Sequence, residues 1–123
     1  MLIIKILARY YKSVIYAVFV LVISLIPFKD TPGSGIFNFP HMDKIIHFFL
    51  YGILCFLLLW DSRNKLRKKD YILIILLCLS FGGIIELLQI SQPERSGDIF
   101  DLIANFFGSL VAVPVFNYTT RLR

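Results

Sequence analysis

Residues 71–90 read YILIILLCLSFGGIIELLQI, a run of twenty in which Glu86 is the only charged side chain. A helix needs roughly 20 apolar residues to cross the hydrocarbon core of a bilayer. The run lies between two polar segments, DSRNKLRKKD at 61–70 and SQPERSGD at 91–98. It therefore predicts a membrane-spanning helix whose two ends meet polar surroundings.

Three more apolar segments of similar kind flank this one, at residues 13–26, 45–60 and 99–116. The whole chain is 58% hydrophobic, with a mean hydropathy of +0.77, far from the balance of a soluble domain. The short segment 61–70 predicts an antiparallel hairpin of the helices on either side of it. The fold prediction is an all-α membrane protein, a four-transmembrane-helix bundle forming a single domain over residues 1–123.

Basic residues decide the predicted orientation of the bundle. Ten of the thirteen fall at one set of helix ends: Lys5, Arg9 and Lys12, the five basic residues within 63–69, and Arg121 with Arg123. The positive-inside rule places these ends, and with them both termini, in the cytoplasm. We interpret the first segment as a retained signal anchor, because no small-residue cleavage pattern follows it.

The net charge of +5 is explained by this topological signal, so no nucleic-acid partner is predicted. The lipid bilayer is the predicted partner, and lipid headgroups are the expected contacts of the basic run at 63–69. Cys55 and Cys78 lie inside two spans, far from any metal-ligand spacing. They are predicted to be packing residues, and neither a disulfide nor a cofactor is predicted.

Polar residues gather at the opposite, outer ends of three spans. Six of the eight acidic residues lie toward this side of the membrane. Charged side chains in a bilayer are costly unless they are paired or face a wet cavity, so they indicate a functional site. The residues predicted to share one shallow layer are Asp43, Lys44, His47 and Tyr51 on the second span, Glu86 and Gln89 on the third, and Arg95, Asp98, Asp101 and Asn105 at the start of the fourth.

Small residues on two of these spans predict close helix packing. Ala104, Gly108 and Ala112 form a small-xxx-small ridge on the fourth span, and Gly82 with Gly83 occupies the third. Such positions let helix backbones approach one another in a membrane. Close packing would draw the polar faces together into an outward-facing pocket.

Three ordered motifs resemble the VanZ-like family of bacterial membrane proteins. They are DKIIHFFLYGILCFLLL from Asp43, GGIIELLQ from Gly82 and RSGDIFDLIANFFGSLVA from Arg95. The matching positions are the ten residues of the polar layer together with Gly108, and the match covers the second to fourth spans.

The resemblance implies a multi-pass protein of the bacterial plasma membrane, in a family named for low-level resistance to the glycopeptide teicoplanin. It implies a role in cell-envelope homeostasis or antibiotic resistance, with a lipid-linked cell-wall precursor or a glycopeptide as the possible partner. It does not supply a reaction, and the oligomeric state stays open.

Each of these residues also has a purely structural interpretation. Asp43 and Lys44 could be an interfacial cap and a snorkelling side chain, Arg95 a loop ion pair, and Asp98 an N-cap. A hydrogen-bond network that ties membrane helices together could account for His47, Glu86 and Asp101.

Three uses of the polar layer remain open at this point. In the first, Arg95 and Lys44 meet the phosphate of a lipid-linked substrate, and a catalytic version uses His47 as base and Glu86 as acid, with Asp43 or Asp101 orienting the histidine. In the second, His47, Glu86, Asp98 and Asp101 hold a hard divalent cation. In the third, the protein is a structural or partner-binding module without catalysis.

Overall fold

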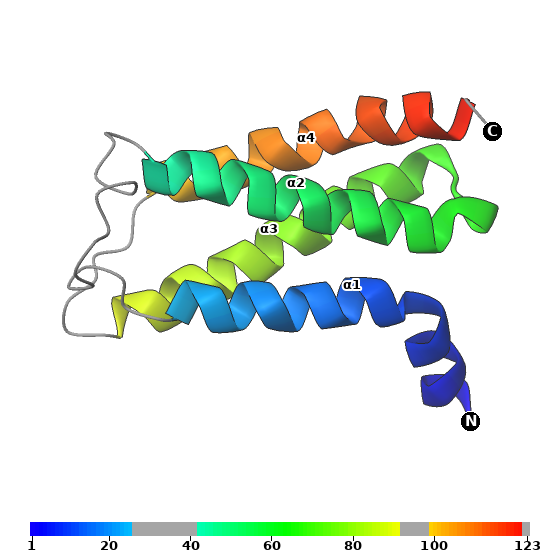
Figure 1. Ribbon diagram of the computed structural model, residues 1–123, viewed down its shortest axis with the longest axis horizontal. Coiled ribbons are helices and arrows are strands. Elements are labelled where there is room, and N and C mark those ends of the chain that lie inside the picture. Colours follow the sequence, from blue (N-terminus) through cyan, green and yellow to red (C-terminus); the bar gives the residue numbers. More distant parts are fainter. Residues whose placement is uncertain (26–41, 92–98, 122–123) are drawn as a thin grey trace.

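In the part of the chain that the structure describes, a computed structural model shows four long helices and one short 3₁₀ helix (Figure 1). They are α1 (Leu2–Leu25), α2 (Met42–Ser62), η2 (Arg63–Lys65), α3 (Lys68–Ile90) and α4 (Ile99–Arg121). The structure describes residues 1–25, 42–91 and 99–121. All four long helices have the length and apolarity to cross a membrane, so the predicted all-α fold is confirmed.

The helices extend beyond the spans predicted from apolarity. The second was predicted at 45–60 and runs over Met42–Ser62, and the fourth was predicted at 99–116 and runs to Arg121. Hydropathy detects only the part of a helix that suits hydrocarbon, whereas backbone hydrogen bonding continues into the polar ends. The difference is largest for α1, which begins at Leu2 rather than near residue 13.

α1 bends at Tyr10, whose backbone has left the helical region at φ −103° and ψ 18°. The bend turns the arm Leu2–Arg9 away from the bundle axis (Figure 1). Beyond it, the carboxylate of Asp61 at the end of α2 accepts hydrogen bonds from the Ser13 backbone N–H at 3.3 Å and from its hydroxyl at 2.7 Å. Asp61 therefore caps the long part of α1 from a different helix, where a local side chain would ordinarily do so.

The ends of the bundle differ in what they bring together. The N-terminal arm, η2 and the end of α4 lie at one end, with both chain termini (Figure 1). The start of α2, the end of α3 and the start of α4 lie at the other (Figure 1). α2 and α3 run in opposite directions through η2, as the predicted hairpin requires.

α2 and α4 make the tightest contact of the bundle, at two glycines. A Cβ on Gly52 would lie 3.1 Å from the Gly108 carbonyl oxygen, and a Cβ on Gly108 would collide with the carbonyl oxygen of Phe48. Only glycine permits backbones to come this close. The predicted small-residue ridge on the fourth span is confirmed at Gly108, with Ala112 buried beside it.

The glycine pair of α3 does not behave as one unit. A Cβ on Gly82 would lie 2.6 Å from Nδ2 of Asn105 and 3.2 Å from the Tyr51 ring, whereas a Cβ on Gly83 would meet nothing within 4 Å. The prediction that both glycines serve close packing is wrong for Gly83. Gly82 makes room for two polar side chains, and Gly83 faces outward.

Apolar side chains cover the outside of the bundle. Ile72, Leu76, Leu87 and Val111 are among many large hydrophobic residues that stay exposed. A soluble protein rarely presents such continuous apolar surface, but hydrocarbon is its natural surrounding. The protein is therefore a multi-pass membrane protein, and Cys55 and Cys78 are buried in its core as predicted.

Candidate functional site

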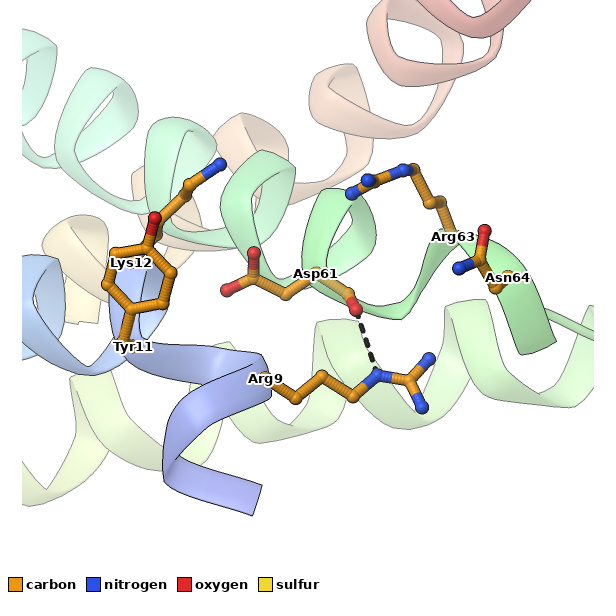
Figure 2. A pocket seen from close by; sticks show the side chains of 6 residues that line it. All are labelled: Arg9, Tyr11, Lys12, Asp61, Arg63 and Asn64. Carbon is orange, nitrogen blue, oxygen red and sulfur yellow. Dashed lines mark hydrogen bonds between the residues drawn. The ribbon is translucent and has the colours of Figure 1, made fainter. Parts of the chain in front are cut away.

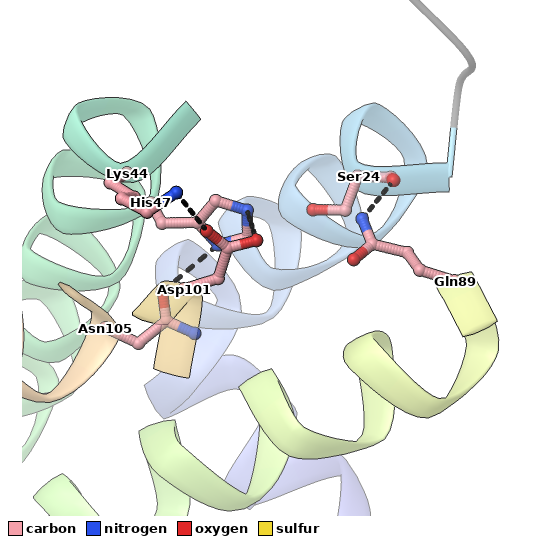
Figure 3. A network of polar contacts seen from close by, with 6 residues as sticks. All are labelled: Ser24, Lys44, His47, Gln89, Asp101 and Asn105. Carbon is pink, nitrogen blue, oxygen red and sulfur yellow. Dashed lines mark hydrogen bonds and ion pairs between the residues drawn. The ribbon is translucent and has the colours of Figure 1, made fainter. Parts of the chain in front are cut away.

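Near the ends of α2, α3 and α4 lies a polar cluster of Lys44, His47, Tyr51, Glu86, Asp101 and Asn105. Lys44 and His47 lie on one face of α2 because they are three residues apart, and Asp101 and Asn105 share a face of α4 at a spacing of four. Figure 3 shows the α2 side chains pointing toward Asp101 of α4. Helical periodicity alone thus turns residues from separate helices toward one place.

Asp101 is the centre of the cluster. Its Oδ1 lies 4.0 Å from the Lys44 ammonium, and its Oδ2 lies 3.8 Å from Nε2 of His47 (Figure 3). The residue is 8% exposed, so its charge is largely removed from water. A buried carboxylate requires compensating charge or hydrogen bonds. Among the described residues, Lys44 brings such a charge to this carboxylate, and so does His47 when its ring is protonated.

His47 is held in one tautomer by Asn105. The Oδ1 of Asn105 can only accept, so Nδ1–H of His47 donates to it at 3.1 Å (Figure 3). In the neutral ring, the lone pair is then on Nε2, the nitrogen that faces Asp101. The sequence predicted Asp43 or Asp101 as the group that orients the ring. Asp101 faces Nε2 at 3.8 Å, the side chain of Asp43 lies outside the described residues, and Asn105 is the partner of Nδ1.

Glu86 of α3 completes a set of groups that can bind metal. It is 6% exposed, and one ligating atom each from His47, Glu86 and Asp101 lies within 4.8 Å of the others. An imidazole nitrogen and carboxylate oxygens bind divalent cations through bonds of about 2.0–2.2 Å. Small side-chain movements would bring all three onto one ion. Asp98, the fourth predicted ligand, lies outside the described residues.

Tyr51 and Asn105 are the most deeply buried residues of the cluster. Both are 0% exposed, and the Tyr51 ring stacks on the His47 ring with 3° between their planes. Among the described residues, neither the Tyr51 hydroxyl nor Nδ2 of Asn105 has a hydrogen-bond partner. Buried polar atoms are seldom left so. The cluster therefore holds two hydrogen-bond donors that a bound polar group could use.

Gln89 is not part of the cluster, although the sequence predicted it in the same layer. Its Nε2 donates to the backbone carbonyl of Ser24 at 2.7 Å, which ties α3 to the end of α1 (Figure 3). Gln89 lies about one helical turn beyond Glu86, and at that level of the bundle its side chain meets α1. The side chain of Asp43 and all of Arg95 lie outside the described residues.

The sequence interpretation missed a second polar group at the opposite end of the bundle. Asp61, Ser13 and Arg9 meet there, since Nε of Arg9 donates to the backbone carbonyl of Asp61 at 3.1 Å. The signal was present, because Asp61 is one of only two acidic residues at the strongly basic helix ends. Its partner Ser13, 48 positions away, gave no sign of the contact.

Comparisons with known proteins give a family and no activity. The family model described as VanZ/LLP1 matches residues 3–119. An uncharacterized protein of Schizosaccharomyces pombe is 35% identical over 75 residues, which are 60% of this chain and 46% of that protein. The chain thus spans less than half of that relative.

A second relative is an uncharacterized protein of Saccharomyces cerevisiae. It is 28% identical over 95 residues, covering 64% of this chain and 81% of the yeast protein. No solved structure matches the chain. The comparisons therefore give the family and leave the role of the polar cluster to its geometry.

Proposed function

Because the chain belongs to the VanZ/LLP1 family, we propose that it binds the polar head of a lipid-linked envelope ligand through its polar cluster. The membrane is the plasma membrane of a bacterium, and the site faces outward. The cellular role is envelope homeostasis, expressed as low-level resistance to glycopeptides such as teicoplanin.

The observation that carries this proposal is the convergence of charged and hydrogen-bonding groups at one end of an otherwise apolar bundle. Lys44 supplies a cation, Asp101 and Glu86 supply acceptors, and Tyr51 and Asn105 supply donors. A lipid-linked ligand combines phosphate with hydroxyl or amide groups, and each has a partner in such a set. The apolar sides of the helices meet the lipid part.

Access to the cluster is from the membrane surface. Side chains become more exposed from Asp101, at 12%, to Lys44, at 26%. A headgroup at the interface can reach Lys44 without crossing hydrocarbon, and His47 and Asp101 lie directly beyond. The arrangement favours binding over transport, because the polar groups form a layer at one end of the bundle.

The test is susceptibility to teicoplanin, with vancomycin alongside, in a bacterium that expresses wild-type protein or Asp101→Asn at matched membrane abundance. We expect wild-type protein to protect and Asp101→Asn to lose the protection. Asp70→Asn is the matched control, because it makes the same chemical change at the other end, where the carboxylate pairs with Arg67 at 3.4 Å. Equal protection by wild type and Asp101→Asn would refute the proposed role of the cluster.

A second candidate function is a divalent-cation site, favoured by the three ligating atoms within 4.8 Å. A bound ion would serve as an electrophile toward phosphate, with the Tyr51 hydroxyl placed to donate a hydrogen bond to a ligand of that ion. We expect purified protein to carry a stoichiometric divalent ion that Glu86→Gln and Asp101→Asn abolish and Asp70→Asn retains. Metal-free wild-type protein with full protective activity would exclude this function.

Catalysis by His47 is a separate hypothesis with its own signature. The lone pair on Nε2, turned toward Asp101, suits a general base. His47→Ala should then abolish activity while the amount of folded protein stays unchanged. If the polar cluster only holds the helices together, the same substitution should lower the folded amount instead.

A further inference from the structure

Two cavities share Arg9, at the end of the bundle opposite the polar cluster, and the larger one extends from there along α3 as far as Ile84. The smaller, the headgroup cavity, has a volume of about 380 Å³ and is lined by Arg9, Tyr11, Lys12, Asp61, Arg63 and Asn64 (Figure 2). The larger, the acyl groove, has a volume of about 800 Å³ between α1, α2 and α3. No residue of the polar layer predicted from the sequence lines either one. Arg63 and Arg67, which do, belong to the basic run at 63–69 that was expected to contact lipid headgroups.

The headgroup cavity carries a surplus of positive charge. Arg9, Lys12 and Arg63 line it together with a single acidic residue, Asp61. The Asp61 carboxylate already accepts two hydrogen bonds from Ser13, and Arg9 binds the Asp61 backbone carbonyl rather than the carboxylate. The three cations therefore retain charge for an anion, and guanidinium groups suit the oxygens of a phosphate.

The positions of two of these cations are fixed by the fold. Arg9 is the last residue before the bend of α1, and its Nε is anchored on Asp61 at 3.1 Å. Arg63 donates to the Trp60 carbonyl at 2.8 Å and lies 4.9 Å from the centre of the Trp60 ring. Groups held in place before a ligand arrives lose less entropy when they bind it.

The acyl groove continues from Arg9 into apolar surroundings. Its walls include Val14 of α1, Leu58 of α2, and Leu73, Leu77 and Ile84 of α3, with Arg67 at its polar mouth. From Asp70 to Ile84 the groove follows α3 for about 21 Å, at roughly 1.5 Å per residue. That distance exceeds the ~15 Å that one leaflet contributes to the hydrocarbon core, so the groove can hold a lipid chain along its full length.

We propose that these two cavities form one binding site for a phospholipid with an anionic headgroup, taken from the membrane leaflet that adjoins the N-terminal arm. The phosphate occupies the headgroup cavity among Arg9, Lys12 and Arg63, and one acyl chain occupies the groove between α1 and α3. The site is independent of the proposed function, because it uses other residues at the other end of the bundle.

Charge and apolar length together identify a lipid as the occupant. A soluble phosphate would bind the cations without filling the groove, whereas a neutral lipid would fill the groove without neutralising the cations. An anionic phospholipid satisfies both halves. Each basic group near a headgroup typically strengthens the binding of an anionic lipid about fivefold.

The test is native mass spectrometry of the purified full chain from mixed nanodiscs of phosphatidylcholine with a minor share of phosphatidylglycerol. We expect the retained lipid to be enriched in phosphatidylglycerol. Arg9→Gln and Lys12→Gln should each lower that enrichment about fivefold. Arg121→Gln removes a basic residue at the same end that does not line either cavity, and it should leave the enrichment unchanged.

Two further measurements separate the halves of the site. Leu77→Trp, which fills the groove without touching a charge, should lower the retention of both lipids while the melting temperature stays near that of wild type. Excess inorganic phosphate should fail to displace phosphatidylglycerol. Displacement by free phosphate, or equal retention of the two lipids by wild-type protein, would overturn the proposal.

Discussion

Asn105 accepts hydrogen bonds from two neighbouring side chains. Its side-chain oxygen accepts from Nδ1 of His47 at 3.1 Å, and its backbone carbonyl accepts from the Ser109 hydroxyl at 2.9 Å. The first bond decides which nitrogen of His47 faces Asp101. The second keeps the polar Ser109 satisfied in the core. Chemistry at the polar cluster is thus set by a residue that carries no charge.

Gly108 is the position where the smallest change should be most harmful. Gly108→Ala places a methyl group against the Phe48 carbonyl, so α2 and α4 must move apart. We expect a loss of about 1–3 kcal/mol in the free energy of unfolding, measured by thermal or chemical denaturation in detergent.

Gly83→Ala is the matched control for this prediction. Its new Cβ meets nothing within 4 Å, and alanine is the better helix former by about 0.8–1.0 kcal/mol. It should be neutral or stabilising. Equal destabilisation by both substitutions would mean that helix packing at Gly108 is not the cause.

Gln89 and Gly83 show what the sequence cannot supply at this scale. Both lie on α3 at the depth where the sequence placed them, but a step of one residue turns a side chain by about 100° around the helix. Gly82 and Glu86 face α2 and α4, Gln89 faces α1, and Gly83 faces outward. Depth in the membrane follows from residue counting. The rotation of α3 follows from packing, which a single sequence does not display.

At the scale of helices, α1 is attached differently from the other three. Only 11% of its apolar stretch is buried, compared with 28% or more for α2, α3 and α4. Its contacts include hydrogen bonds spaced along its length, from Ser13 to Asp61, from the Tyr16 hydroxyl to Leu50, and from Gln89 to Ser24. These directional bonds, rather than extensive burial, hold α1 to the bundle.

Ser13→Ala tests this account of α1. The substitution removes the 2.7 Å hydrogen bond from the Ser13 hydroxyl to the Asp61 carboxylate. The buried carboxylate then keeps only the bond from the Ser13 backbone N–H. We expect a loss of about 1–3 kcal/mol in the free energy of unfolding and faster proteolysis near the bend at Tyr10. Ser80→Ala, at an exposed serine of α3, should change neither quantity.

The outcome that would contradict this prediction is specific. If Ser13→Ala and Ser80→Ala leave stability equally unchanged, the hydroxyl bond from Ser13 to Asp61 does not stabilise α1. A parallel measurement on Asp61→Asn, which keeps the shape and removes the charge, should show a loss similar to that of Ser13→Ala.

For the whole molecule, each end of the bundle has its own chemistry. One end gathers Lys44, His47, Glu86 and Asp101, and the other gathers Arg9, Lys12, Arg63 and the run that follows. Between them lie apolar side chains and the small-residue contact of α2 with α4. The two ends can therefore meet different ligands in different leaflets.

Orientation can be tested with a membrane-impermeant maleimide on intact cells. The native Cys55 and Cys78 are buried and should not react. A cysteine introduced at Ser91, which is exposed at the end of α3, should be modified, and one at the exposed Lys69 should be protected until the cells are permeabilised. Modification of Lys69→Cys alone in intact cells would invert the proposed topology.

The sequence was sufficient to predict the fold and the central residues of the polar cluster. Apolar length predicted four helices, and the spacing of Lys44, His47, Glu86 and Asp101 predicted that they share one layer. It was not sufficient for Asp61, because a contact between Ser13 and a residue 48 positions away depends on how α1 bends. Local patterns reveal helices and their faces, and tertiary contacts appear only when the faces are assembled.

The cap on α1 also has a consequence in time. A growing chain exposes Ser13 long before Asp61 is made, since 48 positions separate them, and helices are delivered to the membrane in order of synthesis. Until α2 is complete, the first helix has no carboxylate to hold its bend. The bent position of the arm Leu2–Arg9 thus indicates that α1 has packed against α2. An antibody or cross-linker specific for the bent form would detect this step.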